Sequence, residues 1–351
     1  MTLGPLMVDV AGLELTAEDT EVLRHPLVGG VILFTRNYRD PDQLTALVSA
    51  IHAARSPSLL VAVDHEGGRV QRFRSGFSVL PPLRRIGKEF DLDPKAGLDL
   101  ARHMGWLMAA ELRACGVDLS FAPCVDLDYG VSEVIGDRAF HAKAPAVSQL
   151  ASAYMHGMRD AGMPATAKHF PGHGAVVADS HTAAPVDRRP FVDLDDDLMP
   201  YRRLISNGLP AVLAAHVLFP QVDNDSVASV SPTWIRNILR GELGFKGVVF
   251  TDDMSMAGAA VAGDIVERSR RALDAGSDMV LICNSRPSVV TVLDKLKVEA
   301  QPASSVRLVR MRGRDGMPRE SLMASAEWQQ CREMLARCAA PPALKLEAGR
   351  A

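Results

Sequence analysis

The segment AKHFPGHGAVVADSH, residues 167–181, holds the densest group of side chains that can move protons. It places His169, His173, Asp179 and His181 on a stretch rich in glycine and proline, where a strand-to-helix connection normally needs only about 2–6 residues. Asp179 and His181 are separated by one residue, so in a turn the carboxylate can accept a hydrogen bond from one imidazole nitrogen. The carboxylate also favours the protonated imidazole, whose other nitrogen can then act as a general acid and base. We therefore predict an acid/base pair on a long functional loop.

Two other chemistries compete for this segment. A metal ion could be held by His169, His173 and His181. However, the Pro-Gly pair between the first two histidines prevents them from sharing one helical face, so we expect no metal. Lys168 follows an expected strand and could form a Schiff base, as in barrel aldolases. Such a lysine is activated by an apolar pocket, whereas the immediate neighbour of Lys168 is a histidine.

The segment KGVVFTDDMSM, residues 246–256, leads from an apolar run directly into two carboxylates, Asp252 and Asp253. Successive side chains of a strand point to opposite faces, so only one of the two can face the interior of a closed sheet. The periodicity does not say which one. An N-cap for the following turn would explain one carboxylate and leave the other to be explained by function.

A third polar group lies in VAVDHEGGRVQR, residues 61–72. Asp64 follows an apolar run, and the two glycines permit a tight turn that could bring Arg69 and Arg72 back over the strand end. These charges could form a solvated ion pair of little energetic value. Alternatively, the carboxylate grips two hydroxyl groups of a sugar and an arginine completes the grip.

The elements that must position these residues alternate along the chain. Short apolar, β-branched runs are followed by segments of helical period, which is typical of parallel strands joined by crossover helices. Strands are expected at 6–10, 30–34, 59–63, 117–121, 164–167, 211–215, 247–251 and 279–282. Helices are expected near 17–24, 41–54, 95–115, 145–161, 195–207, 232–240, 264–275 and 287–297. This pattern predicts an α/β fold, a single (β/α)8 TIM-like barrel, whereas a doubly wound sheet would normally show a glycine-rich phosphate turn.

Polar side chains follow six of the expected strands, at the barrel end where catalytic loops gather. They are Asp9, Asp64, Lys168, His169, His216, Asp252, Asp253 and Asn284. Any one of them could be a cap or a satisfied buried group. Unrelated structural groups would be spread over both barrel ends, so their common position predicts one site.

The chain shows no proline-, glycine- or serine-rich linker, which favours one catalytic domain over residues 1–338. A helical extension is expected at 319–338, with Leu322, Met323, Trp328 and Leu335 packed on the barrel wall. Residues 339–351 are expected to form a loose tail.

Composition limits the partners and the compartment. Lys and Arg number 39 against 42 Asp and Glu, giving a formal charge of −3, so a nucleic-acid partner is not expected. The five scattered cysteines suit a reducing compartment. The first residues lack an export signal, and no apolar run reaches the roughly 18 residues of a membrane span. We expect a cytoplasmic protein, a monomer, with no membrane partner.

The ordered motifs carry a family resemblance. GPLMVDVAG, VDHEGGRVQR, FAPCVDLDYG, VIGDRAF, KHFPGHGAVVADSH, AAHVLFP and TDDMSM follow one another from the first strand to beyond the seventh. On these motifs the chain resembles the bacterial β-N-acetylhexosaminidases of glycoside hydrolase family 3, the NagZ type, which act in peptidoglycan recycling. The pairing of KHFPGHG with a following DSH is the most specific of these signals. Two positions depart from the family pattern: His65 stands where Gln is common, and GAVVADSH stands where others have GDTxxDSH.

The resemblance implies a role for each candidate residue. Asp252 would attack the anomeric carbon to form a covalent glycosyl-enzyme, with retention of configuration. His181, held by Asp179, would protonate the leaving oxygen and later activate water. The sugar would be held by Asp64, Arg72, Arg138, Lys168 and His169. Further candidates at the same site are His173, His216 and Asp253.

The implied reaction is the removal of terminal non-reducing N-acetylglucosamine from muropeptides (GlcNAc-anhydroMurNAc-peptides), with no cofactor. Its partner is therefore a small carbohydrate substrate. Two alternatives remain open, a Schiff-base lyase using Lys168 and a barrel that binds sugar without cleaving it.

Overall fold

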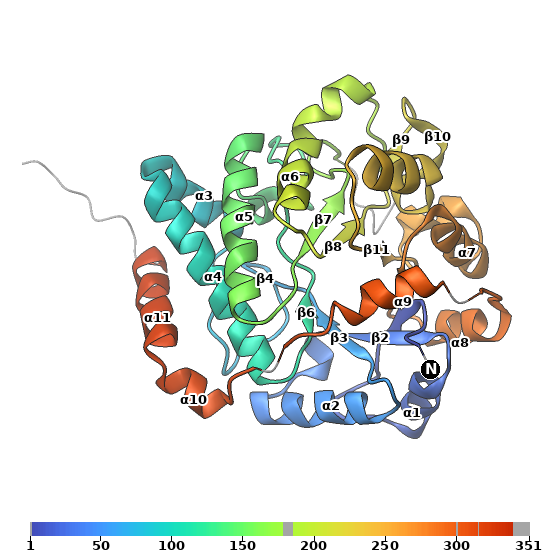
Figure 1. Cartoon of the computed structure of the whole chain (residues 1–351), viewed down its shortest axis with the longest axis horizontal. Helices are drawn as coiled ribbons and strands as arrows, with labels where there is room; N and C mark the ends of the chain where they lie inside the picture. Colours follow the sequence, from blue (N-terminus) through green and yellow to red (C-terminus); the bar gives the residue numbers. More distant parts are fainter. Residues whose placement is uncertain (1, 178–184, 300, 315, 340–351) are drawn as a thin grey trace, which may run out of the picture.

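Eight parallel strands form a barrel at the centre of the molecule (Figure 1). The computed structural model describes residues 2–177, 185–299, 301–314 and 316–339. The barrel strands are β1 (Leu6–Val8), β2 (Val28–Leu33), β3 (Leu60–Val63), β6 (Leu119–Ser120), β7 (Thr166–Phe170), β8 (Ala211–Ala214), β11 (Val248–Asp253) and β12 (Met279–Ile282). They pair in the order β6-β3-β2-β1-β12-β11-β8-β7. A parallel bridge between Cys124 and Lys168 joins the end of β6 to β7, so the predicted (β/α)8 barrel is confirmed.

Helices cover the outside of the barrel, close to the predicted positions. They are α1 (Ala17–Arg24), α2 (Pro41–Ala53), α4 (Pro94–Ala114), α5 (Ala144–Asp160), α6 (Asp195–Ser206), a π-helix (Thr233–Glu242), α7 (Ile265–Ala275) and α8 (Arg286–Lys295). Their starts follow from local chemistry. Asp40 accepts a hydrogen bond from the Gln43 N–H at 2.8 Å before α2, and Asp264 caps α7 in the same way. α7 ends at Gly276, whose φ of 109° suits a residue without a side chain.

Side-chain alternation divides the core into a barrel interior and a strand-to-helix layer. Leu213, Phe250 and Leu281 belong to the interior cluster. The residue before each of them on its strand, Val212, Val249 or Val280, belongs to the layer that faces the helices. Inside the barrel, Phe121 packs edge to face on Phe250 with ring centroids 5.3 Å apart. The interior is therefore a packed core, and the next inward position on β11 after Phe250 is residue 252.

The C-terminal extension closes the barrel at the amino ends of its strands. Helix α9 (Pro302–Val309) brings Leu308 into the interior cluster, and Met311 joins it just beyond the helix. Asp278, which precedes β12, accepts hydrogen bonds from Ser304 Oγ at 2.6 Å and Arg307 Nη1 at 2.9 Å. The extension is thus part of the barrel's core and not an appended tail.

The predicted helix 319–338 is two helices, α10 (Arg319–Ala324) and α11 (Ala326–Ala339), which pack against α4 (Figure 1). The prediction of one helix was wrong because Ser325 interrupts it and caps α11, its Oγ accepting from the Trp328 N–H at 3.2 Å. Leu322 and Leu335 are buried and Trp328 packs on the core, as predicted. Met323 is 41% exposed, contrary to the prediction. Ala339 ends α11, and the rest of the expected tail lies outside the described residues.

Several elements were not predicted. They are the hairpins β4 (His65–Gly67) with β5 (Val70–Gln71) and β9 (Leu218–Phe219) with β10 (Asp223–Val227), helix α3 (Leu83–Leu92), and 3-10 turns at Thr35–Asn37, Gly136–Arg138, Phe191–Leu194, Ala228–Val230 and Ala257–Ala262. The hairpins are too short to show a clear alternation in the sequence.

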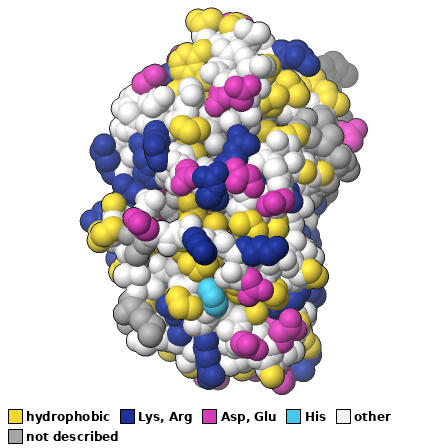
Figure 2. Space-filling view, turned by 90° about the vertical axis from the view of Figure 1, so that its right-hand side faces the viewer, with side chains coloured by type: hydrophobic (Ala, Val, Ile, Leu, Met, Phe, Trp, Pro, Cys, Tyr) yellow, Lys and Arg dark blue, Asp and Glu magenta, His cyan; other side chains and the backbone are white. Residues whose placement is uncertain are grey.

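Acidic and basic side chains are interspersed on the face shown in Figure 2, in line with the small net charge of −3. Among the described helices, none combines the length and the apolar character that a membrane span requires.

Candidate active site

A cavity of about 800 Å³ lies where the loops following the barrel strands meet. Its lining includes eight of the predicted site residues: Asp64, Arg72, Arg138, Lys168, His169, His173, Asp252 and Asp253. His216 is buried and is not part of the lining. The predicted convergence of polar side chains on one barrel end is therefore observed.

The two carboxylates at the end of β11 have different surroundings. Asp253 accepts hydrogen bonds from the Ser255 N–H (2.9 Å), Ser255 Oγ (2.6 Å) and the Cys283 N–H (3.0 Å), so it fixes the turn after the strand. Burial raises the pKa of Asp253 to about 6. Asp252 continues the inward series from Phe250, and its Oδ1 accepts from the Asp253 N–H at 2.9 Å.

Asp252 is held in the ionised form. Burial alone would raise the pKa of this carboxyl, but His216 and then His169 act in the opposite sense, and the pKa is lowered overall. The side chain is partly exposed in the cavity. An ionised carboxylate with a free approach from the cavity can act as a nucleophile or stabilise a cation.

A chain of alternating charges forms one wall of the cavity. Lys168 Nζ contacts Asp64 Oδ1 at 2.7 Å and Glu66 Oε1 at 2.6 Å. Arg138 binds Glu66 with two parallel hydrogen bonds of 2.8 and 2.9 Å. Arg72 Nη2 lies 3.7 Å from Asp64 Oδ2, which leaves both groups able to bind a ligand. This wall presents both donors and acceptors, as a polyhydroxylated ligand requires.

The charge state of Lys168 decides between two of the predicted chemistries. Burial would lower the pKa of its ammonium group, but Asp64 and Glu66 raise it, and the overall shift is upward. A Schiff-base lysine must lose its proton to attack a carbonyl. The surroundings of Lys168 oppose that loss and favour a hydrogen-bond donor.

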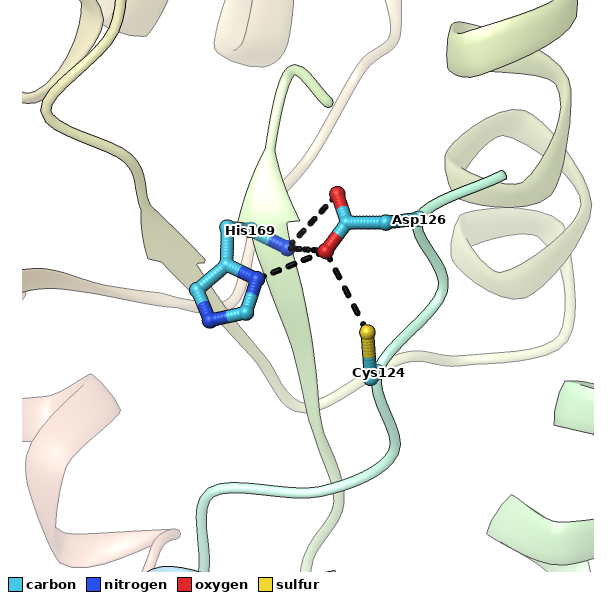
Figure 3. A group of neighbouring side chains, drawn as sticks. All are labelled: Cys124, Asp126 and His169. Carbon is cyan, nitrogen blue, oxygen red and sulfur yellow. Dashed lines mark hydrogen bonds and ion pairs between the residues drawn. The ribbon is translucent and has the colours of Figure 1, made fainter. Parts of the chain in front are cut away.

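His169 is held by Asp126, as Figure 3 shows. The ring Nδ1 lies 2.6 Å from Asp126 Oδ2, and the Cys124 thiol donates to the same oxygen at 3.2 Å. Cys124, Asp126 and His169 are close enough to suggest a metal site. Two ligand atoms on one tetrahedral ion would lie roughly 3.3 Å apart, so the 2.6 Å contact is a hydrogen bond and does not fit shared metal binding.

The other two predicted site histidines that the structure describes, His173 and His216, differ in their partners. The ring nitrogens of His173 are buried and have no hydrogen-bond partner among the described residues, and burial lowers the pKa of the ring. His216 Nε2 lies 2.9 Å from the Asp253 carbonyl and Nδ1 lies 2.7 Å from Ser229 Oγ. Burial also lowers the pKa of His216, and its contact with the Asp253 carbonyl supports the end of β11.

Residues 5–311 match the glycosyl hydrolase family 3 N-terminal domain. The chain belongs to glycosyl hydrolase family 3. The β-hexosaminidase of Thiobacillus denitrificans is 57% identical over 89% of this chain and 87% of its own length. That of Thioalkalivibrio sulfidiphilus is 52% identical over 99% of this chain and its own full length.

A solved structure agrees with these relatives. The crystal structure of NagZ from Neisseria gonorrhoeae in complex with N-trifluoroacetyl-D-glucosamine superimposes with a TM-score of 0.91 and is 41% identical. The match covers 97% of this chain and 99% of that one. The predicted enzyme class, a glycoside hydrolase of the β-hexosaminidase type, is confirmed by these comparisons.

Part of the predicted family 3 site lies outside the described residues, namely Asp179 and His181. The described chain that resumes after them is anchored to α6. Arg189 binds Asp187 at 2.6 Å and Asp197 at 2.9 Å. The ion pair with Asp187 lies within one segment, whereas the ion pair with Asp197 joins that segment to α6.

Two residues of this family 3 site were missed by the sequence analysis, Glu66 and Asp126. Both are 2% exposed and lie within motifs that were recognised, VDHEGGRVQR and FAPCVDLDYG. Asp126 does not directly follow the fourth barrel strand, which ends at Ser120, so the rule applied to the other strands did not reach it. Glu66 lies in the β4 hairpin, and its direction could not be inferred without that hairpin.

The unusual His65 does not reach the cavity. Its ring packs against Phe73 and Phe77 with centroids 5.7 and 5.6 Å away. Burial lowers the pKa of His65 to about 3, so the ring is a neutral part of the core. Replacement of the common Gln at this position therefore leaves the cavity chemistry unchanged.

Proposed function

We propose that this family 3 hydrolase is a retaining exo-β-N-acetylglucosaminidase that releases terminal non-reducing N-acetylglucosamine from muropeptides (GlcNAc-anhydroMurNAc-peptides) in peptidoglycan recycling. The observation that carries the proposal is an ionised Asp252 at the inner end of β11, facing a cavity walled by Asp64, Lys168 and Arg138. The cytoplasmic location, the monomeric state and a single catalytic domain over residues 1–338 stay predictions.

Asp252 is the proposed nucleophile. Attack on the anomeric carbon forms a bond from a carboxylate oxygen to that carbon and releases the leaving-group oxygen. The lowered pKa keeps the carboxylate ionised at neutral pH. Asp253 is unsuited to this task because its carboxylate already accepts three hydrogen bonds within the turn.

The acid/base role is assigned to His181, oriented by Asp179, on the basis of the loop motif. A second imidazole in the cavity, His169, is a weaker candidate. Its Nε2 lies 3.2 Å from Arg138 Nη2, and a guanidinium can only donate, so that nitrogen carries no proton to give. The proton for the leaving oxygen must therefore come from another group.

Sugar recognition is assigned to Asp64, Arg72, Arg138, Lys168 and His169. The three cations among them are paired with Asp64 and with the buried Glu66. Such a wall binds hydroxyl and acetamido groups by directed hydrogen bonds. The acetamido group makes substrate-assisted catalysis a second possible mechanism, in which its oxygen attacks instead of Asp252.

The anomeric form of the first product tests the reaction. A GlcNAc-anhydroMurNAc-peptide is mixed with the enzyme inside an NMR tube, and the anomeric proton is followed before mutarotation. We expect β-N-acetylglucosamine first, with anhydroMurNAc-peptide as the co-product by mass spectrometry. An initial α product, or no cleavage of this substrate while a nitrophenyl glycoside is cleaved, would refute the stereochemistry or the substrate assignment respectively.

A further inference from the structure

We propose that Asp126 is a positioning residue that holds His169 as a neutral imidazole with its proton on Nδ1, so that Nε2 is a hydrogen-bond acceptor in the cavity. The inference rests on the proposed function, in which His169 helps to hold the sugar. It assigns to this ring the opposite hydrogen-bonding role from the cations beside it.

The Nδ1 side of the ring is fixed by a carboxylate whose two oxygens both accept hydrogen bonds. Asp126 Oδ2 lies 2.6 Å from His169 Nδ1, and Oδ1 accepts a hydrogen bond from the His173 N–H at 2.8 Å. The His169 main-chain N–H lies 3.2 and 3.3 Å from the two oxygens. Main-chain N–H groups thus point at both oxygens, which favours the ionised carboxylate. An ionised carboxylate only accepts, so Nδ1 carries a proton.

The Nε2 side is fixed by a group that only donates. Arg138 Nη2 lies 3.2 Å from His169 Nε2. Arg138 is itself held by its two hydrogen bonds to the buried Glu66, so it cannot turn another face to the ring. A proton on Nε2 would point at an N–H of the guanidinium. The two neighbours together allow one tautomer.

This tautomer completes the hydrogen-bonding set of the wall. Lys168 and Arg138 offer donors, and the carboxylate of Asp64 offers an acceptor that is already shared with Lys168. An unprotonated Nε2 has one lone pair, which accepts from Arg138 Nη2 and so helps to fix that guanidinium at the cavity wall. Asp126 touches no cavity atom itself and acts through His169.

The substitution Asp126→Asn is informative because an amide has one acceptor and one donor. If the amide oxygen keeps the His173 N–H, the NH2 group faces His169 Nδ1 and inverts the tautomer. If the amide is turned round, the NH2 group faces the His173 N–H. Each orientation loses one of the two contacts.

A matched control lies at the other end of the barrel. Asp118 is also a buried carboxylate that pairs with a histidine, His52, at 3.1 Å and accepts main-chain N–H groups from Val61 and Gly313. Asp118→Asn therefore makes the same chemical change in the same kind of pair, away from the cavity. It measures the purely structural cost.

The experiment combines kinetics with a direct view of the ring. KM and kcat for a nitrophenyl β-N-acetylglucosaminide are measured for Asp126→Asn, His169→Ala, the double variant and Asp118→Asn. We expect Asp126→Asn to raise KM about 10- to 100-fold, the range for a lost hydrogen bond to a charged group. In the His169→Ala background the same change should cost less than about 2-fold, because coupled residues are not additive. Asp118→Asn should lower Tm and leave KM unchanged.

The tautomer is observed by long-range 1H–15N NMR of histidine-labelled wild-type enzyme, with His169→Ala to assign the signals. A proton on Nδ1 alone is the expected result. A proton on Nε2, or an equal cost of Asp126→Asn with and without His169, would overturn the inference. The NMR measurement needs neither turnover nor a folded Asp126→Asn variant. Failure of the proposed function would appear separately, as absent hydrolysis with the tautomer as expected.

Discussion

The two ends of the barrel use the same pair of side chains for different purposes. At the amino ends of the strands, Asp118 binds His52 and main-chain N–H groups of the barrel and of the C-terminal extension. At the carboxyl ends, Asp126 binds His169 and main-chain N–H groups of the β7 loop. The difference lies in what the histidine meets next. The second nitrogen of His169 meets Arg138 at the cavity wall, whereas His52 lies on the outer helix α2.

A buried aspartate-histidine pair therefore serves only the stability of the fold, unless the second ring nitrogen of its histidine lies at a cavity. Carboxylates at the amino ends, Asp118 and Asp278, fasten the extension that plugs the barrel. Carboxylates at the carboxyl ends, Asp64 and Asp252 among them, line the cavity. Substitutions at the first end should therefore affect stability, and substitutions at the second end should affect activity as well.

The largest effect is expected for Asp252→Asn. Removing the proposed nucleophile should lower kcat by on the order of 10^4- to 10^6-fold while Tm changes little, because the side chain makes few structural contacts. Steady-state kinetics and thermal unfolding measure both quantities. Asp253→Asn is the neighbouring comparison and should lower Tm more and kcat less. A reversed order would show that the wrong carboxylate has been assigned.

Next come two buried ion pairs, one at each end. Glu66→Gln leaves Arg138 and Lys168 without their shared partner, and Asp278→Asn does the same to Arg240 and Arg307. Each change should lower the free energy of unfolding by about 3–5 kcal/mol in urea titrations. Only Glu66→Gln should also raise KM. An equal rise in KM for Asp278→Asn would break the division between the two ends.

The C-terminal extension that closes the barrel, with Leu308 and Met311 in its interior, provides a third test. Met311 is fully buried in the barrel interior, so Met311→Ala should lower the free energy of unfolding by about 2–5 kcal/mol. KM should stay at the wild-type value in the folded variant. Met323→Ala is the control, since Met323 is 41% exposed and its loss should change stability by less than about 0.5 kcal/mol. A large effect of Met323→Ala would mean that the extension packs differently.

The smallest effect concerns pH. The pKa of Asp253 is raised from 3.8 to about 6, so the folded state binds this proton more tightly than the unfolded chain. Its contribution to stability is full below pH 3.8 and is lost as pH rises through about 6. Asp253→Asn lacks this pH dependence, so the stability lost by the substitution at low pH should shrink by up to about 3 kcal/mol as pH rises through this window. Urea unfolding at pH 4 to 7 measures it, and a parallel pH dependence of both proteins would refute the assignment.

Much of the fold followed from sequence patterns because a parallel barrel repeats one unit. All eight strands were found near their predicted positions, since each is a short apolar run set apart by a longer helical segment. The plug and the short hairpins were not found. Leu308 and Met311 are apolar residues of an ordinary amphipathic segment, and nothing local in their sequence distinguishes the barrel interior from the barrel wall.

The site was predicted in part for a similar reason. Position after a strand indicated Asp64, Lys168, His169 and Asp252, but β11 is apolar on both faces, so the alternation of side chains could not choose between Asp252 and Asp253. The family resemblance pointed to Asp252, and the inward-facing Phe250 two residues earlier agrees with it. Glu66 and Asp126 were missed because their roles depend on partners far away in the chain, Arg138 and His169.

The most direct test of the account is covalent trapping of the nucleophile. A fluorinated N-acetylglucosaminyl substrate that forms a slowly hydrolysed glycosyl-enzyme is incubated with the protein, which is then digested and sequenced by mass spectrometry. We predict one added sugar on the peptide from β11, attached at Asp252. A label on any other residue, or inactivation kinetics with no covalent sugar on the protein, would contradict the account.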